Sequence, residues 1–298
     1  MGSRERACAA TIGTFDGVHR GHQHVLARTR EIAGPDAEIV AVTFDPHPLA
    51  VLRPDHAPRR LTSIGRRVEL LRAARADEVR VLDFTAEMAG WSPREFVERA
   101  IVDQLHAAHL VVGENFRFGH RAAGDVALLR ELAPGLGFTA HGLALDGDDE
   151  PFSSTLVRSH VAAARLHDAA RVLGRPHAVE GVVTAGQRRG RELGFPTANV
   201  PVDEAYAVPP DGVYAGRLHC GGQTYPAAVS VGTNPTFGEH DRRVESYVID
   251  HGHDLDLYGQ PARVDLVEHL RPMVAYEGVD ALVRQMHADV DAARAILG

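Results

Sequence analysis

Hydrophobic residues in the first half of the chain form short runs that alternate with helical patterns. Residues 7–14, 38–44 and 109–112 are apolar or β-branched, and each run is followed by glycine, proline or polar residues. Such runs are typical of strands buried on both faces of a parallel sheet. Residues 63–74 have apolar positions at helical spacing, and residues 92–95 read Ser-Pro-Arg-Glu, a capped helix start. The pattern predicts an α/β domain with a Rossmann-like parallel sheet, and we expect the arginines and glutamates of both helices to be solvated.

The period changes from helix to strand in the second half. Residues 161–173 are alanine-rich and helical, and Gly-Arg-Pro-His at 174–177 ends them, so we expect domains at 1–174 and 175–298. Short alternating or β-branched segments follow at 179–184, 212–219, 224–231, 244–250 and 261–268. They predict a small antiparallel β-barrel. We expect a closing helix at 278–297 to pack on it through Leu282, Met286, Val290, Ala293 and Leu297.

The composition excludes several classes of enzyme. The chain has 298 residues and a net charge of -8, and all 32 of its Lys+Arg residues are arginine. A phosphate-binding loop that ends in Gly-Lys-Ser/Thr, a protein-kinase fold and a Schiff-base enzyme all need a lysine, so these classes are excluded. The acidic balance argues against nonspecific nucleic-acid binding. With no membrane span, no signal peptide and only two distant cysteines, we expect a cytoplasmic protein without a disulfide.

Residues 11–23 run from a predicted strand through a glycine-rich turn into a helix that contains His19-Arg-Gly21-His22. A helix N-terminus offers N–H groups and a positive dipole end, and Gly21 leaves room for a phosphate close to the backbone. The two imidazoles, three residues apart, share one helical face. The segment suits a nucleotide phosphate, and the alternative is a pair of helix-capping histidines.

Two further segments carry candidate ligand groups. Asn115, Phe116 and Phe118 lie in a glycine-bounded loop after a predicted strand, where the aromatic rings either line a pocket for a flat ring or anchor the core. Ser154 and Thr155 begin a predicted helix with Arg158 about one turn further on, a pattern that is also a good N-cap.

Residues 190–200 read Gly-Arg-Glu-Leu-Gly-Phe-Pro-Thr-Ala-Asn-Val. Gly190 and Gly194 let the backbone approach an anion, and Thr197 and Asn199 are uncharged oxygen donors of the kind that Mg²⁺ accepts. The alternative is a surface turn with a capping threonine. Glu245 shares a strand face with Tyr247 and Ile249, which is unusual for an acid, although it could also be a solvated rim residue.

These segments resemble the motifs of bacterial bifunctional riboflavin kinase/FAD synthetases. Gly-Thr-Phe-Asp-Gly-Val-His at 13–19 and the following His-x-Gly-His resemble the nucleotidyltransferase signature of FAD synthetases, as do Asn-Phe-Arg-Phe-Gly at 115–119 and Ser-Ser-Thr-Leu-Val-Arg at 153–158. The segment at 190–199 resembles the phosphate and metal loop of riboflavin kinases, and 244–259 resembles the element that carries their general base. The resemblance spans nearly the whole chain.

The resemblance implies an FMN adenylyltransferase domain at 1–174 and a riboflavin kinase domain at 175–298. It implies catalytic roles for His19, His22 and Glu245. The implied ATP and phosphate ligands are Gly13, Thr14, Phe15, Gly21, Ser154, Thr155, Arg158, Gly190, Arg191 and Gly194. Flavin would contact Asn115, Phe116 and Phe118, and Mg²⁺ would contact Thr197 and Asn199.

The expected partners are small molecules: ATP with Mg²⁺, riboflavin and FMN, with FAD as the product. We expect no nucleic acid and no membrane, and the sequence leaves a weak homo-oligomer open. Two alternatives remain, namely a single-activity enzyme with one decayed domain and a noncatalytic flavin-binding regulatory protein.

Overall fold

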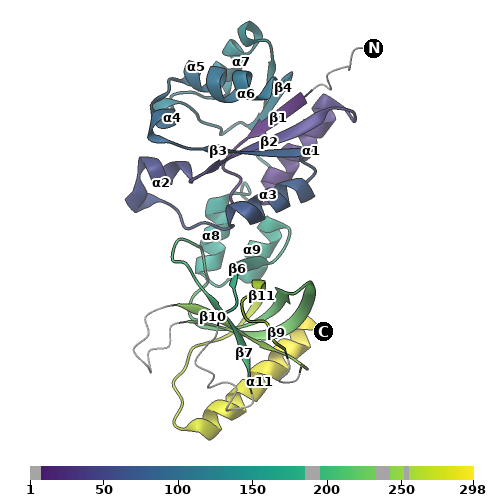
Figure 1. The fold of residues 1–298 in the computed structure, drawn as a ribbon, viewed down its shortest axis with the longest axis vertical. Helices are drawn as coiled ribbons and strands as arrows, with labels where there is room; N and C mark the ends of the chain where they lie inside the picture. Colours follow the sequence, from purple (N-terminus) through teal and green to yellow (C-terminus); the bar gives the residue numbers. More distant parts are fainter. Residues whose placement is uncertain (1–7, 185–194, 233–241, 252–254) are drawn as a thin grey trace. The chain divides into compact units, whose positions relative to one another are not determined.

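The computed structural model describes residues 8–184, 195–232, 242–251 and 255–298 (Figure 1). The chain divides into two compact units: unit 1 comprises Met1–Pro58 and Thr62–Ser154, and unit 2 comprises Arg59–Leu61 and Thr155–Gly298. The domain boundary that we predicted near residue 175 divides the two expected activities, not the two compact units. It stays a prediction. Within the described ranges, every helix is too short or too polar to cross a membrane.

Unit 1 is built on a parallel sheet with the strand order β3-β2-β1-β4-β5. Its strands are β1 (Cys8–Ile12), β2 (Glu38–Asp45), β3 (Glu78–Asp83), β4 (His109–Gly113) and β5 (Thr139–Leu143). The central strand β1 places Thr11 between Ala41 of β2 and Val111 of β4. The predicted parallel sheet is therefore confirmed. Because the chain order reverses at β1, the carboxyl ends of β1 and β4 lie where open parallel sheets bind ligands.

Helices cover both faces of this sheet (Figure 1). They are α1 (Arg20–Ala33), α2 (Pro48–Leu52), η1 (Pro54–His56), α3 (Ile64–Ala73), α4 (Ala86–Gly90), α5 (Pro93–Phe96), η2 (Val97–Val102), α6 (Asp103–Leu105), η3 (His120–Ala122), α7 (Val126–Leu132) and η4 (Pro134–Leu136). Alternate residues of β2 point to opposite faces of the sheet. Ile39 packs with Leu26 of α1 and Leu71 of α3, whereas Val40 belongs to the core that contains α5, η2 and α7. Two buried faces explain why the strands read as continuous apolar runs.

Unit 2 contains α9 (Leu166–Leu173), an antiparallel sheet and all of α8 (Ser154–Ala162) except its first residue, Ser154, which belongs to unit 1. The strands are β6 (His177–Val182), β7 (Thr197–Pro201), β8 (Gly212–Cys220), β9 (Gln223–Gly232), β10 (Arg243–Val248) and β11 (Pro261–Pro272). The order is β6-β11-β8-β9-β10-β7. The sheet curls until its two edges meet at a bridge, where Thr184 N donates to Asn199 O over 2.8 Å. This curled half-barrel confirms the predicted antiparallel architecture.

Glycine lets the two edges of this sheet approach each other. A Cβ atom on Gly181 of β6 would lie only 2.6 Å from Val200 Cγ1 of β7, so a larger residue there would collide with the opposite edge. The concave side holds the apolar core of the unit, with Val200, Val229, Val244 and Val264 fully buried. The same core contains Cys220, and both Cys220 and Cys8 are free thiols.

Helix α11 (Val279–Leu297) packs on the outer face of the curled sheet. The predicted apolar stripe is confirmed at Met286, Val290, Ala293 and Leu297, and Val283 joins them. Arg271 of β11 links the sheet to Asp289 of α11 by two hydrogen bonds. Its Nε donates to Oδ1 over 2.8 Å and its Nη2 donates to Oδ2 over 2.7 Å. Its hydrogen bonds to the Asp289 carboxylate raise the pKa of Arg271 above its ordinary value.

Candidate active sites

The first candidate site is the loop between β1 and α1 in unit 1. Gly13 N donates to Val42 O over 3.0 Å, so the chain leaves the sheet directly beside β2. Gly13 and Thr14 are partly exposed, whereas Phe15 is buried and packs in the core between the sheet and α1 and α3. The loop therefore offers backbone atoms at the carboxyl end of the central strand.

The backbone of this loop is strained. Phe15 has φ 48° and Val18 has φ 40°, on either side of Gly17 at φ 81°. Positive φ is unusual for a bulky residue and more so for a β-branched one. Each such residue costs of order 1–3 kcal/mol, and it persists only where the surroundings hold it.

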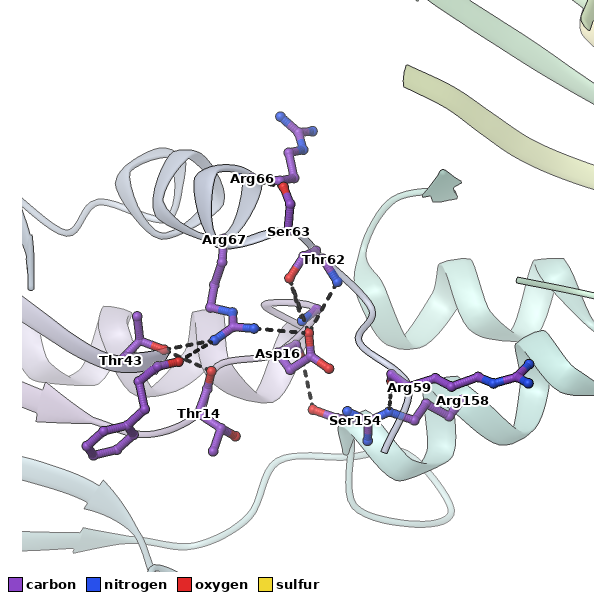
Figure 2. A network of polar contacts seen from close by, with 12 residues as sticks. Thr14, Asp16, Thr43, Arg59, Thr62, Ser63, Arg66, Arg67, Ser154 and Arg158 are labelled. Carbon is purple, nitrogen blue, oxygen red and sulfur yellow. Dashed lines mark hydrogen bonds and ion pairs between the residues drawn. The ribbon is translucent and has the colours of Figure 1, made fainter. Parts of the chain in front are cut away.

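Side chains from three other segments hold the loop (Figure 2). Thr43 Oγ1 of β2 donates to Thr14 O over 2.9 Å, and Ser154 Oγ at the start of α8 donates to Asp16 O over 2.8 Å. Gly17 N donates to Thr62 Oγ1, just before α3, over 3.3 Å. The loop is thus fixed by hydrogen bonds to its backbone at three positions, which lie on both sides of Phe15 and before Val18.

A buried ion pair lies beneath these contacts. Arg67 Nη2 of α3 is 3.5 Å from Asp16 Oδ1, and the two side chains are 2% and 1% exposed. Thr62 also donates to Asp16 Oδ1, from its backbone N over 3.2 Å and from Oγ1 over 3.3 Å. The expectation that the arginines of this helix are solvated was wrong for Arg67. The overlooked signal is spacing, because Arg67 lies four residues before the buried Leu71 and so shares its helical face.

The two histidines of the motif lie at the start of α1. His19 occupies the N-cap position, but its side chain makes no capping hydrogen bond. Its ring stacks on that of His22 with centroids 3.6 Å apart, and Phe15 meets His22 edge-on at 5.0 Å. A Cβ at Gly21 would lie 3.1 Å from His19 Cε1, so glycine permits this close packing. The structure therefore brings both imidazoles to the helix N-terminus that follows the strained loop.

The other residues predicted for unit 1 are more dispersed. Phe118 is 4% exposed and packs against Phe96 with ring centroids 5.7 Å apart, as a core residue does. Phe116 is partly buried and stacks on Phe118 at 5.5 Å, and Asn115 is exposed in the loop after β4.

Helix α8 carries the last predicted group of the adenylyltransferase motifs. Thr155, next to Ser154, is exposed. Arg158 belongs to unit 2, where its Nε donates to Arg59 O over 2.6 Å. The hydroxyl of Ser154 is thus engaged with the loop, and the guanidinium of Arg158 has a backbone partner of its own.

The second candidate site lies on strands β7 and β10 of unit 2. Glu245 is the cross-strand partner of Asn199, and Tyr247 is the partner of Thr197. Residues that oppose each other, and those two apart along a strand, share one face of a sheet. The structure therefore places Glu245, Thr197 and Asn199 together on one face, which the sequence did not establish. Gly190, Arg191 and Gly194 lie outside the described residues.

Local contacts order this second site. Asn199 is 4% exposed, and its Nδ2 donates to Thr197 O over 3.2 Å and to Thr197 Oγ1 over 3.3 Å. Tyr247 and Ile249 belong to the outer cluster beneath α11. Glu245 and Tyr247, two residues apart on β10, share this face of the sheet, as predicted. In the described part of the chain, no group of three or more His, Cys, Asp or Glu side chains could hold a metal ion.

Comparisons with known proteins agree with a two-part transferase. The family model for FAD synthetase matches residues 2–156, and the model for riboflavin kinase matches residues 173–297. A bifunctional riboflavin kinase/FMN adenylyltransferase from Pseudomonas fluorescens is 39% identical over 98% of this chain and 93% of its own length. The protein of that name from Escherichia coli strain K12 is 34% identical over 99% and 94%. The chain belongs to the family of bifunctional riboflavin kinase/FMN adenylyltransferases.

The likeness extends to a solved structure. The crystal structure of a macrolide-efflux protein from Streptococcus pneumoniae matches with a TM-score of 0.87 and 29% sequence identity, over 98% of this chain and 95% of that one. The fold is therefore shared over nearly the full length of both chains.

Proposed function

We propose that this protein converts riboflavin to FMN and then FMN to FAD, using one ATP in each step. The proposal is supported by the match of one chain to both family models, FAD synthetase at residues 2–156 and riboflavin kinase at residues 173–297. Unit 2 would transfer the γ-phosphoryl group of ATP to riboflavin. Unit 1 would transfer AMP to the phosphate of FMN and release pyrophosphate.

Adenylyl transfer needs positioning and charge neutralisation. A phosphate oxygen of FMN attacks the α-phosphorus of ATP and pyrophosphate leaves, so no covalent enzyme intermediate is required. The N-terminus of α1 and the backbone of Gly13 and Thr14 would hold the phosphates, with Phe15 supporting the loop from the core. His19 and His22 would donate hydrogen bonds to the charge that develops in the transition state.

The remaining roles in adenylyl transfer rest on the motifs rather than on observed contacts. Thr155 and Arg158 would bind the outgoing pyrophosphate, while Ser154 supports the loop through Asp16 O. Asn115 and Phe116 would contact the flavin, with Phe118 as the core residue on which Phe116 stacks.

Phosphoryl transfer in unit 2 needs a base. Glu245 would accept the proton of the ribityl hydroxyl as its oxygen attacks the γ-phosphorus and ADP leaves. Thr197 and Asn199 fit Mg²⁺, because a hydroxyl and an amide carbonyl are hard neutral oxygen donors and the contacts of Asn199 Nδ2 with Thr197 leave Oδ1 as the atom to face a cation. The ion, when bound with ATP, would neutralise phosphate charge. Gly190, Arg191 and Gly194 complete the proposed phosphate loop.

The test is incubation of the protein with riboflavin, ATP and Mg²⁺, with the products separated by chromatography. The proposal predicts FMN first and FAD later. FMN without FAD would indicate a decayed first domain, and binding without turnover would indicate a flavin-binding protein. The cytoplasmic location, the weak homo-oligomer, and the lack of nucleic-acid and membrane partners stay predictions.

A further inference from the structure

We propose that Arg67 is a positioning residue for adenylyl transfer, which holds the loop at residues 13–18 in its strained shape through Asp16 and Thr43. The inference rests on the proposed FMN adenylyltransferase activity. It extends the site to a residue that no motif marks and that cannot itself touch a ligand, because its side chain is 2% exposed.

The Arg67 guanidinium is connected to the loop in two ways, directly through Asp16 and indirectly through Thr43. Arg67 Nη1 donates to Thr43 Oγ1 over 3.3 Å and to Phe44 O over 3.1 Å, while Nη2 reaches Asp16 Oδ1 at 3.5 Å. Thr43 passes the contact on, since its hydroxyl donates to Thr14 O. Arg67 is therefore connected to the residues on both sides of Phe15, whose φ is 48° (Figure 2).

A buried ion pair is a poor way to gain stability alone. Removing two charges from water carries a large desolvation penalty, and well-packed apolar residues often stabilise a fold as well or better. Arginine suits a different task here, because its rigid fork binds several acceptors at fixed angles. The pair, with Thr43 and Thr62, supplies the directional contacts that a strained loop needs in order to keep one conformation.

The alternative is that Arg67 serves folding only, and the test must separate the two roles. The variants are Arg67→Met and the double variant Asp16→Asn with Arg67→Met, in the full chain. The single variant leaves the Asp16 charge buried without its cation and should unfold at a lower temperature, whereas the double variant removes both charges and should recover most of that loss. Arg66→Met is the matched control: Arg66 is the neighbouring residue of α3, it pairs with Glu69 at the surface over 2.8 Å, and Figure 2 shows its side chain directed away from Asp16.

The measurements are the unfolding temperature and the kcat and KM of FAD formation from supplied FMN and ATP. In the double variant we expect an unfolding temperature near that of the wild type but a kcat lower by about 10²-fold, the scale of a misplacement of about 1 Å, with KM for FMN changed less than kcat. Arg66→Met should keep both quantities.

Two outcomes would overturn the proposal. If kcat of the double variant returns to the wild-type value together with stability, Arg67 has only a structural role. If Arg67→Met itself turns over as fast as the wild type, the loop does not need it. Absence of FAD formation in the wild-type chain is a distinct result, because it contradicts the proposed activity and this inference with it.

Discussion

The loop after β1 in unit 1 and the β7–β10 pair in unit 2 place their candidate residues by different means. The loop has positive φ at three of four consecutive residues, and the side chains of Thr43, Thr62 and Ser154 hold it. Glu245 and Asn199 are instead paired by the register of two regular strands. A site made by strand register should respond to loss of its own functional groups, whereas a site made by a strained loop should also respond to distant changes.

Glu245→Gln should give the largest effect in unit 2, because glutamine keeps the size of the side chain and cannot take a proton. A general base contributes about 10²- to 10⁴-fold in rate, so kcat for FMN formation should fall by that amount. FAD formation from supplied FMN is the control and should be unchanged. Turnover near the wild-type level would remove Glu245 as the base.

His22→Ala, and likewise His19→Ala, should lower FAD formation by about 10²- to 10³-fold, the usual cost of losing a donor to transition-state charge. FMN formation should stay near the wild-type rate, because both rings lie in unit 1. A parallel fall in the two rates would contradict the assignment of the two reactions to separate units.

Thr197→Val should have a smaller effect that depends on Mg²⁺. Valine has nearly the shape of threonine but lacks the hydroxyl oxygen, so the Mg²⁺ and ATP complex should bind more weakly. Titration with Mg²⁺ should recover part of the riboflavin kinase rate of Thr197→Val and none of that of Glu245→Gln. The same response in both variants would mean that the roles of base and metal ligand are divided incorrectly.

Asp289→Ala should mainly affect the stability of unit 2. It removes two hydrogen bonds to a charged Arg271, a loss of about 2–3 kcal/mol, and it loosens α11 from the sheet. Heat inactivation of riboflavin kinase should then occur several degrees lower. The control is Asp291→Ala, whose pair with Arg294 is exposed and screened by solvent, so its loss should leave the inactivation temperature nearly unchanged. Equal inactivation temperatures in these two variants would show that the Arg271 contact does not hold the helix.

The sequence was informative where a local pattern decides structure. Buried runs predicted the parallel sheet of unit 1, and alternation predicted the antiparallel strands of unit 2 and the common face of Glu245 and Tyr247. It could not supply the pairing of Glu245 with Asn199, because strand register between distant segments depends on tertiary packing. It also failed for Arg67, whose partner Asp16 lies 51 residues away, because charge alone indicates a solvated side chain.

Two independent sites on one chain are expected to act in succession. The most direct measurement is FAD formation from riboflavin and ATP by His22→Ala alone, by Glu245→Gln alone, and by the two variants mixed. We expect FMN but almost no FAD from the first variant, almost no product from the second, and FAD from the mixture, because each protein keeps the reaction that the other has lost. A mixture that forms no more FAD than either variant alone would contradict it.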